Sequence, residues 1–148
     1  MYRVLLPIGE NADHALAAVE AVATLPNADE NVEAVLLNVY EGFEVTGEAG
    51  RIESEDVWDA ENFPDSVDAA RDRLDAAGIS VSARREHGDP AEEILAVAAA
   101  IDADAIVMSA RRRSPAGKAL FGSTTQSVLV SADRPVTVTL AETPSGAS

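Results

Sequence analysis

Apolar runs alternate with segments of helical periodicity along the whole chain. Five runs carry strand signals: YRVLLPI (2–8), VEAVLLNVY (32–40), ISVSARRE (79–86), DAIVMSA (104–110) and PVTVTL (135–140). Between them, apolar residues recur at intervals of three and four, which predicts helices over 12–25, 64–77, 90–101 and 119–132. The predicted order of elements is therefore β-α-β-α-β-α-β-α-β.

This strict alternation favours a parallel sheet, because each parallel connection needs a right-handed crossover that usually contains a helix. The runs VLLPI and AVLLNV are typical of strands that are buried on both faces. We therefore expect a single-domain α/β protein with an open, parallel, five-stranded sheet and helices on both faces.

The helix boundaries carry residues that agree with the periodicity. Asp89, Pro90 and Glu92 supply an N-cap, a proline at the first helical position and an acidic residue at the third. Pro64 and Asp65 open the preceding helix, and Gly78 ends it.

One domain is expected over residues 1–142. It is interrupted by a long acidic insertion, 41–63, which contains Trp58 and follows neither periodicity, so we interpret it as a mobile loop or a short lid. Residues 143–148 are expected to form a disordered tail.

The composition is strongly acidic, with 26 Asp and Glu against 11 Lys and Arg and a net charge of -15. Such a surface repels phosphate backbones, so nucleic-acid binding is not expected. With 47% hydrophobic residues the chain can still build a core. The near-absence of lysine suggests a salt-adapted host, where high ionic strength screens carboxylate repulsion.

The residue inventory excludes several classes of chemistry. There is no cysteine, which excludes disulfides and thiolate metal sites, and two histidines alone make a transition-metal enzyme unexpected. No apolar run approaches the roughly 20 residues of a membrane span, and no leader precedes the first strand-like run. We expect a soluble, cytoplasmic protein with no membrane partner and no metal site of its own.

Positive charge is concentrated in the stretch SARRRSPAGKALFGST (109–124), where four of the 11 basic residues fall within eight positions: Arg111, Arg112, Arg113 and Lys118. The stretch leaves the carboxyl end of the fourth strand, where open parallel sheets bind ligands. It ends in Gly122-Ser123-Thr124 at the start of a helix, where free N–H groups and the helix dipole attract anions. The pattern indicates an anion site; alternatively, the arginines neutralise neighbouring carboxylates.

Two familiar phosphate motifs are absent. A Walker A loop would need a glycine where Arg112 stands and a hydroxyl residue where Ala119 follows Lys118. No G-x-G-x-x-G fingerprint occurs either. The signatures of P-loop hydrolysis and of hydride transfer are therefore missing.

The chain resembles the universal stress proteins over almost its whole length, in VLLPIG, GDPAEEIL, DADAIVMSA, the loop ending in FGST, and PVTVTL. The resemblance implies a Rossmann-like, adenine nucleotide alpha hydrolase-like fold with strand order 3-2-1-4-5 and dimerisation through the fifth strands. One branch of the family binds ATP through G-x-x-G-x9-G-[ST]; another lacks this motif and does not bind ATP.

The family motif is only partly present. Gly122-Ser123 match its closing pair, but Ser109 and Arg112 stand where it has glycines. Where the family has V-P-x-D, this chain has Leu6-Pro7-Ile8-Gly9, and Val39 matches the position that borders adenine. Arg112 could fill the phosphate position or bind the phosphate itself. The nucleotide-binding residues expected from the stretch and the resemblance together are Pro7, Ile8, Gly9, Val39, Met108, Ser109, Arg111, Arg112, Lys118, Gly122, Ser123 and Thr124.

The resulting expectation is a small stress-response module that binds ATP, with magnesium, or a related nucleotide or anion between the first and fourth strands. We find no catalytic residue and expect at most very slow ATP hydrolysis. The expected partners are a second copy, joined through Pro135 to Leu140, and a protein not identified by the sequence. The alternative is a dimeric interaction protein of the non-ATP-binding branch with a degenerate pocket.

Overall fold

The computed structural model describes residues 2–9, 12–40, 65–112, 119–120 and 122–141. The strands are β1 (Tyr2–Pro7), β2 (Val32–Tyr40), β3 (Ser80–His87), β4 (Ala105–Arg112), β5 (Ala119–Leu120) and β6 (Val136–Ala141). The helices are α1 (Ala12–Ala23), α2 (Ala28–Asn31), α4 (Asp65–Ala76), α5 (Pro90–Ala100) and α6 (Ser123–Ser131). The acidic insertion at 41–63 and the tail at 143–148 lie outside the described residues.

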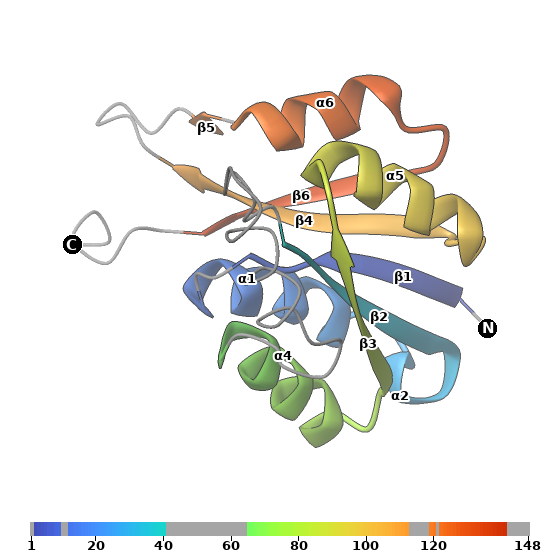
Figure 1. Cartoon of the computed structure of the whole chain (residues 1–148). Helices are drawn as coiled ribbons and strands as arrows, with labels where there is room; N and C mark the ends of the chain where they lie inside the picture. Colours follow the sequence, from blue (N-terminus) through green and yellow to red (C-terminus); the bar gives the residue numbers. More distant parts are fainter. Residues whose placement is uncertain (1, 10–11, 41–64, 113–118, 121, 142–148) are drawn as a thin grey trace, which may run out of the picture.

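The sheet confirms the predicted topology. Five parallel strands lie side by side in the order β3-β2-β1-β4-β6, so β6 is the fifth parallel strand of the sequence prediction. The two-residue strand β5 is added to the end of β4 in antiparallel register. Figure 1 shows the resulting open, twisted sheet.

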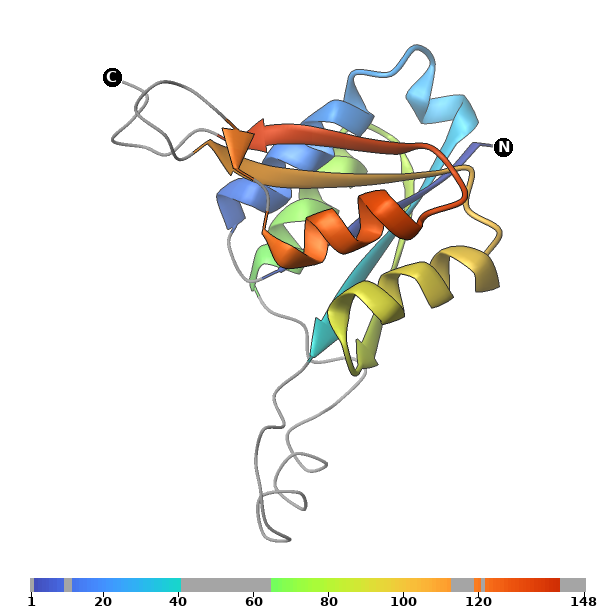
Figure 2. The same ribbon diagram turned by 90° about the horizontal axis from the view of Figure 1, so that it is seen from above.

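Helices cover both faces of the sheet, as Figures 1 and 2 show: α1 and α4 on one, α5 and α6 on the other. Alternate strand residues serve the two layers. Leu6 and Leu36 join the core under α1 and α4, whereas Leu5 and Leu37 join the core under α5 and α6. All four are fully buried, which explains why β1 and β2 read as continuous apolar runs.

The helix ends match the sequence signals where these fall on described residues. The Asp89 carboxylate accepts a hydrogen bond from the Glu92 N–H at 3.0 Å, and Pro90 is the first residue of α5. Gly78, just beyond α4, has φ +77, a conformation that favours glycine.

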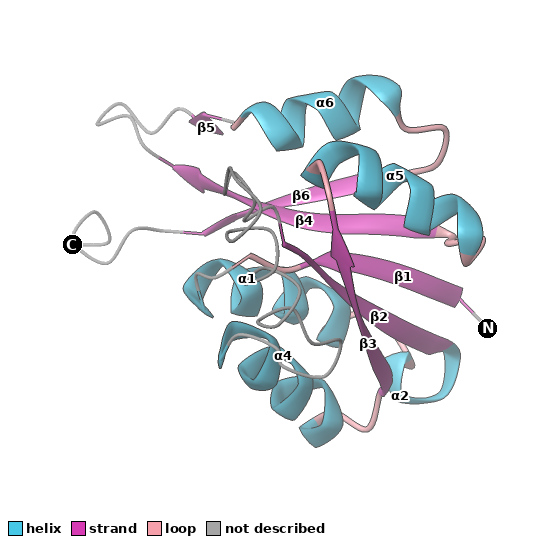
Figure 3. Cartoon of the chain, viewed as in Figure 1, coloured by secondary structure: helices cyan, strands magenta, loops and turns pink. Residues whose placement is uncertain are grey.

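The region after β4 differs from the prediction. Strand β4 continues through Arg112, and residues 119–120 form β5 instead of the first turn of a helix (Figure 3). Pairing with β4 outweighs the helical periodicity there, and α6 begins only after Gly122, which is extended at φ -71 and ψ 172. Within α6, Val128 is fully buried, whereas its neighbour Leu129 is 40% exposed.

The short helix α2 was not predicted, because four residues are too few to show a periodicity. Among the helices that the structure describes, none has both the length and the apolar character that a membrane crossing requires.

Candidate functional site

The loop after β1 is held by its neighbour β2. Ile8 donates its main-chain N–H to the Leu37 oxygen at 2.7 Å, which extends the β1–β2 pairing by one residue. The side-chain amide of Asn38 then donates to the Ile8 oxygen at 3.0 Å. Ile8 and Asn38 are both buried, so buried hydrogen bonds to β2 hold this part of the predicted site in place.

The next residue, Gly9, is held from a different direction. The hydroxyl of Ser66, in the first turn of α4, donates to the Gly9 oxygen at 2.5 Å. Ser66 is 1% exposed, whereas Gly9 is exposed, and a Cβ added to Gly9 would meet no atom within 4 Å. The loop is therefore anchored on its buried side and open on its outer side.

Strands β1 and β4 are paired over only part of their lengths. The register joins Val4 to Ala105 and Leu5 to Ile106, although β1 continues to Pro7 and β4 to Arg112. Strand order reverses between these two strands, since β2 lies beyond β1 and β6 beyond β4. In open α/β sheets, ligands bind outside the carboxyl ends of the strands at such a switch point.

Two further predicted residues, Met108 and Ser109, lie on the part of β4 that extends beyond its pairing with β1. Met108 is buried in the core under α5 and α6, and its main-chain oxygen accepts a hydrogen bond from the Thr139 hydroxyl at 3.4 Å. Ser109 is half-buried. Both residues belong to a regular strand that is paired with β6. Ser109 therefore lies in a strand and not in a glycine-rich loop.

Helix α6 begins at the same end of the sheet. Gly122 is its N-cap, no described side chain caps it, and its first turn contains no acidic residue. Gly122 and Ser123 are exposed and Thr124 is half-buried, and a Cβ added to Gly122 would meet no atom within 4 Å. The amide N–H groups of a first helical turn have no partner within the helix, so this end suits an anion.

The basic cluster is placed only in part. The prediction that Arg111 and Arg112 lie in a loop is wrong, because they are the last residues of β4 and pair with Leu120 and Ala119. Residues 119–120 therefore run antiparallel to the end of β4. The predictions for Arg113 and Lys118 lie outside the described residues.

The match to known proteins decides the family. The profile of the universal stress protein family matches residues 1–139. The chain belongs to this family. No curated protein matches the sequence.

Solved structures of other universal stress proteins have the same fold. One from Archaeoglobus fulgidus has a TM-score of 0.66 at 23% identity, over 93% of this chain and 98% of the other. A second from Archaeoglobus fulgidus, in complex with dAMP, has a TM-score of 0.61 at 19% identity, over 93% and 97%. One from Arabidopsis thaliana with AMP bound has a TM-score of 0.65 at 13% identity, over 100% of each chain.

In this universal stress protein the described candidate residues lie at one end of the sheet, the end formed by the carboxyl ends of the parallel strands. The β1 loop, the ends of β2 and β4 and the first turn of α6 all lie where the parallel strands end (Figure 1). Val39, near the end of β2, packs on the same core as Met108. Ser66 was not singled out in the sequence, since nothing there indicates that a serine 57 residues away would contact Gly9.

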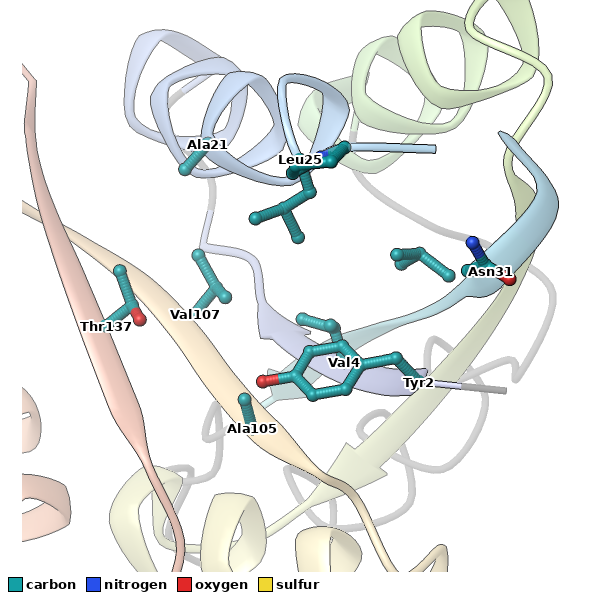
Figure 4. A pocket seen from close by; sticks show the side chains of 10 residues that line it. Tyr2, Val4, Ala21, Leu25, Asn31, Ala105, Val107 and Thr137 are labelled. Carbon is teal, nitrogen blue, oxygen red and sulfur yellow. The ribbon is translucent and has the colours of Figure 1, made fainter. Parts of the chain in front are cut away.

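An apolar hollow of about 330 Å³ lies at the other end of the sheet, near the starts of β1 and β2 (Figure 4). It is lined by Tyr2, Val4, Ala21, Leu25, Pro26, Asn31, Val32, Ala105, Val107 and Thr137. None of the predicted nucleotide-binding residues lines it, and its walls are mostly alkyl groups that offer phosphate no donor. This hollow is therefore separate from the candidate site.

Among the described residues, no group of three or more His, Cys, Asp or Glu side chains could hold a metal ion.

Proposed function

We propose that this universal stress protein binds ATP or a related phosphate-bearing anion where β1 and β4 separate, beside the first turn of α6. The observation that carries the proposal is the N-terminus of α6, which begins at an exposed glycine and has no side-chain cap among the described residues. Structures of two other members contain dAMP and AMP, which supports an adenine nucleotide as the ligand class.

The physical basis is the match between phosphate and the start of a helix. Unpaired N–H groups of the first turn and the helix dipole stabilise negative charge, and the missing side chain at Gly122 leaves room for close approach. The hydroxyls of Ser123 and Thr124 can donate to phosphate oxygens. Gly9 stands where the family commonly has an aspartate, so the β1 loop lacks that negative charge. Magnesium enters only as part of Mg-ATP.

The biological role follows as part of the same proposal: a cytoplasmic stress-response module that acts by binding and has at most very slow turnover. It would form a homodimer through β6, whose described pairing is to β4 alone, and would signal to a protein partner. Sedimentation in molar KCl tests the dimer, and a purely monomeric protein would contradict it.

A second candidate function comes from the non-ATP-binding branch of the family. Ser109 and Arg112 occupy two glycine positions of the ATP motif, and both belong to the regular strand β4. A strand at these positions favours a degenerate pocket and a protein that acts through its dimer interface. The two functions differ in one measurable property, nucleotide affinity.

Calorimetry with Mg-ATP, AMP and tripolyphosphate in molar KCl separates the two functions. We expect Mg-ATP to bind to the wild type and Gly122→Asp to weaken it at least tenfold, since the new carboxylate takes the anion's place at the helix N-terminus. Aspartate is also a good N-cap, so the melting temperature should not fall. The control, Ser131→Asp, adds the same charge at the exposed end of the same helix and should retain binding. A wild type that binds none of the three ligands would refute the proposed function and favour the second candidate.

A further inference from the structure

Two consecutive main-chain oxygens of the β1 loop each accept a hydrogen bond from a buried side chain. The Ile8 oxygen accepts from Asn38 of β2 at 3.0 Å, and the Gly9 oxygen accepts from Ser66 of α4 at 2.5 Å. The donors come from two elements that are far apart in the sequence. They fix two successive peptide groups at the point where the chain leaves the sheet.

Burial of these two polar side chains is unusual in this core. Asn38 is 5% exposed and Ser66 is 1% exposed, and they are two of the three buried polar residues that the structure describes. Asn38 follows the apolar residues Leu36 and Leu37, where another aliphatic side chain would suit the strand. A buried polar group costs free energy unless it is hydrogen-bonded, so both side chains are kept in place by their bonds to the loop.

The fold by itself does not require the loop oxygens to be bonded to protein. Gly9 is exposed, and carbonyl groups of surface loops can be satisfied by water. Here both oxygens are instead bonded toward the protein interior, and the space outside Gly9 stays open. An anion that approaches Gly9 from that open side would therefore be repelled less by these two carbonyl oxygens.

We propose that Asn38 and Ser66 are positioning residues of the nucleotide site, which hold the Ile8–Gly9 loop in its binding conformation before the ligand arrives. The inference rests on the proposed function and adds which residues keep the binding loop ordered. Fixing a loop in advance removes part of the entropy that the ligand would otherwise have to pay for ordering it. Loss of either donor leaves the loop to sample other conformations, so affinity falls although neither residue touches the ligand.

The experiment compares Ser66→Ala and Asn38→Leu with the wild type by calorimetry with Mg-ATP in molar KCl. A second readout is amide hydrogen exchange at Ile8, whose N–H is bonded to the Leu37 oxygen and is exposed to exchange when the loop loosens. We expect about tenfold weaker binding and faster Ile8 exchange in both variants, with binding restored in Ser66→Thr, which keeps the hydroxyl.

The matched control is Thr24→Ala. The Thr24 hydroxyl also donates to main-chain oxygens, those of Glu20 and Ala21, but it is exposed at the end of α1. This variant loses a similar hydrogen bond away from the loop, so both its affinity and its Ile8 exchange should match the wild type.

The outcomes separate this inference from the proposed function. If the wild type does not bind Mg-ATP, the proposed function fails and the inference fails with it. If the wild type binds and the folded variants bind equally well, only the positioning role is refuted. Should Ser66→Ala fail to fold, Asn38→Leu decides, because leucine is compatible with the apolar strand around it.

Discussion

The guanidinium of Arg134 donates to the main-chain oxygen of Ala103 at 2.8 Å, just beyond the end of α5. The same nitrogen also donates to the Ala98 oxygen at 3.1 Å, within the last turn of the helix. The Arg134 side chain is only 17% exposed. In a chain with few basic residues, this arginine serves a helix C-terminus, where positive charge and N–H donors are both favourable.

Arg134→Ala is expected to lower the free energy of unfolding by about 1–3 kcal/mol, because it removes a charged donor from two carbonyl groups. Urea denaturation in molar KCl measures the change. The control is Arg73→Ala, which breaks an exposed ion pair with Glu20; hydrogen bonding and the charge of Glu20 raise the pKa of Arg73. Exposed pairs contribute little in high salt, so Arg73→Ala should be nearly neutral. If the two substitutions lowered the free energy of unfolding equally, the special role of Arg134 would be contradicted.

Gly9→Asp restores the residue that the family commonly has in the first loop. The substitution should leave the melting temperature unchanged within error, since a Cβ at Gly9 meets open space. We expect weaker binding of tripolyphosphate, because the new carboxylate repels it, and a higher preference for ATP over tripolyphosphate, because a carboxylate can accept from ribose hydroxyls. Calorimetry with both ligands measures the ratio, and an unchanged ratio would place Gly9 outside the site. Gly9→Asn controls for size without charge.

Arg112→Ala tests whether the arginine in the motif's glycine position helps or hinders the ligand. We expect the affinity for Mg-ATP to fall about tenfold, or about 1.4 kcal/mol, because guanidinium groups form charge-assisted hydrogen bonds with phosphate. Alanine keeps the strand backbone that pairs Arg112 with Ala119. Tighter binding would show that the arginine obstructs the site, and Arg112→Lys separates charge from shape.

The net charge of -15 predicts a strong dependence of stability on salt. Repulsion between carboxylates destabilises the compact state, and molar salt shortens the screening length to about 3 Å. The melting temperature should therefore rise substantially between dilute buffer and molar KCl. A thermal melt followed by circular dichroism measures it, and potassium glutamate as a second salt shows whether the effect depends on the anion. A melting temperature that does not change with salt would contradict salt adaptation.

The sequence by itself determined the sheet and its covering helices, because burial on both faces leaves a continuous apolar run that few other structures produce. Leu5 and Leu6 face opposite cores, as a strand between two helical layers requires. The helix caps at Asp89 and Gly78 could also be predicted from the sequence, since each depends on residues only a few positions apart.

Only the tertiary structure decided the surroundings of the site. The pairing of Arg112 with Ala119 replaced a predicted helical turn by a strand, because a partner strand outweighs local propensity. The bond from Ser66 to Gly9 joins residues 57 positions apart, and no local pattern records such a contact. Periodicity reports which side of an element is buried, whereas the choice of donor for a particular oxygen depends on how distant elements pack.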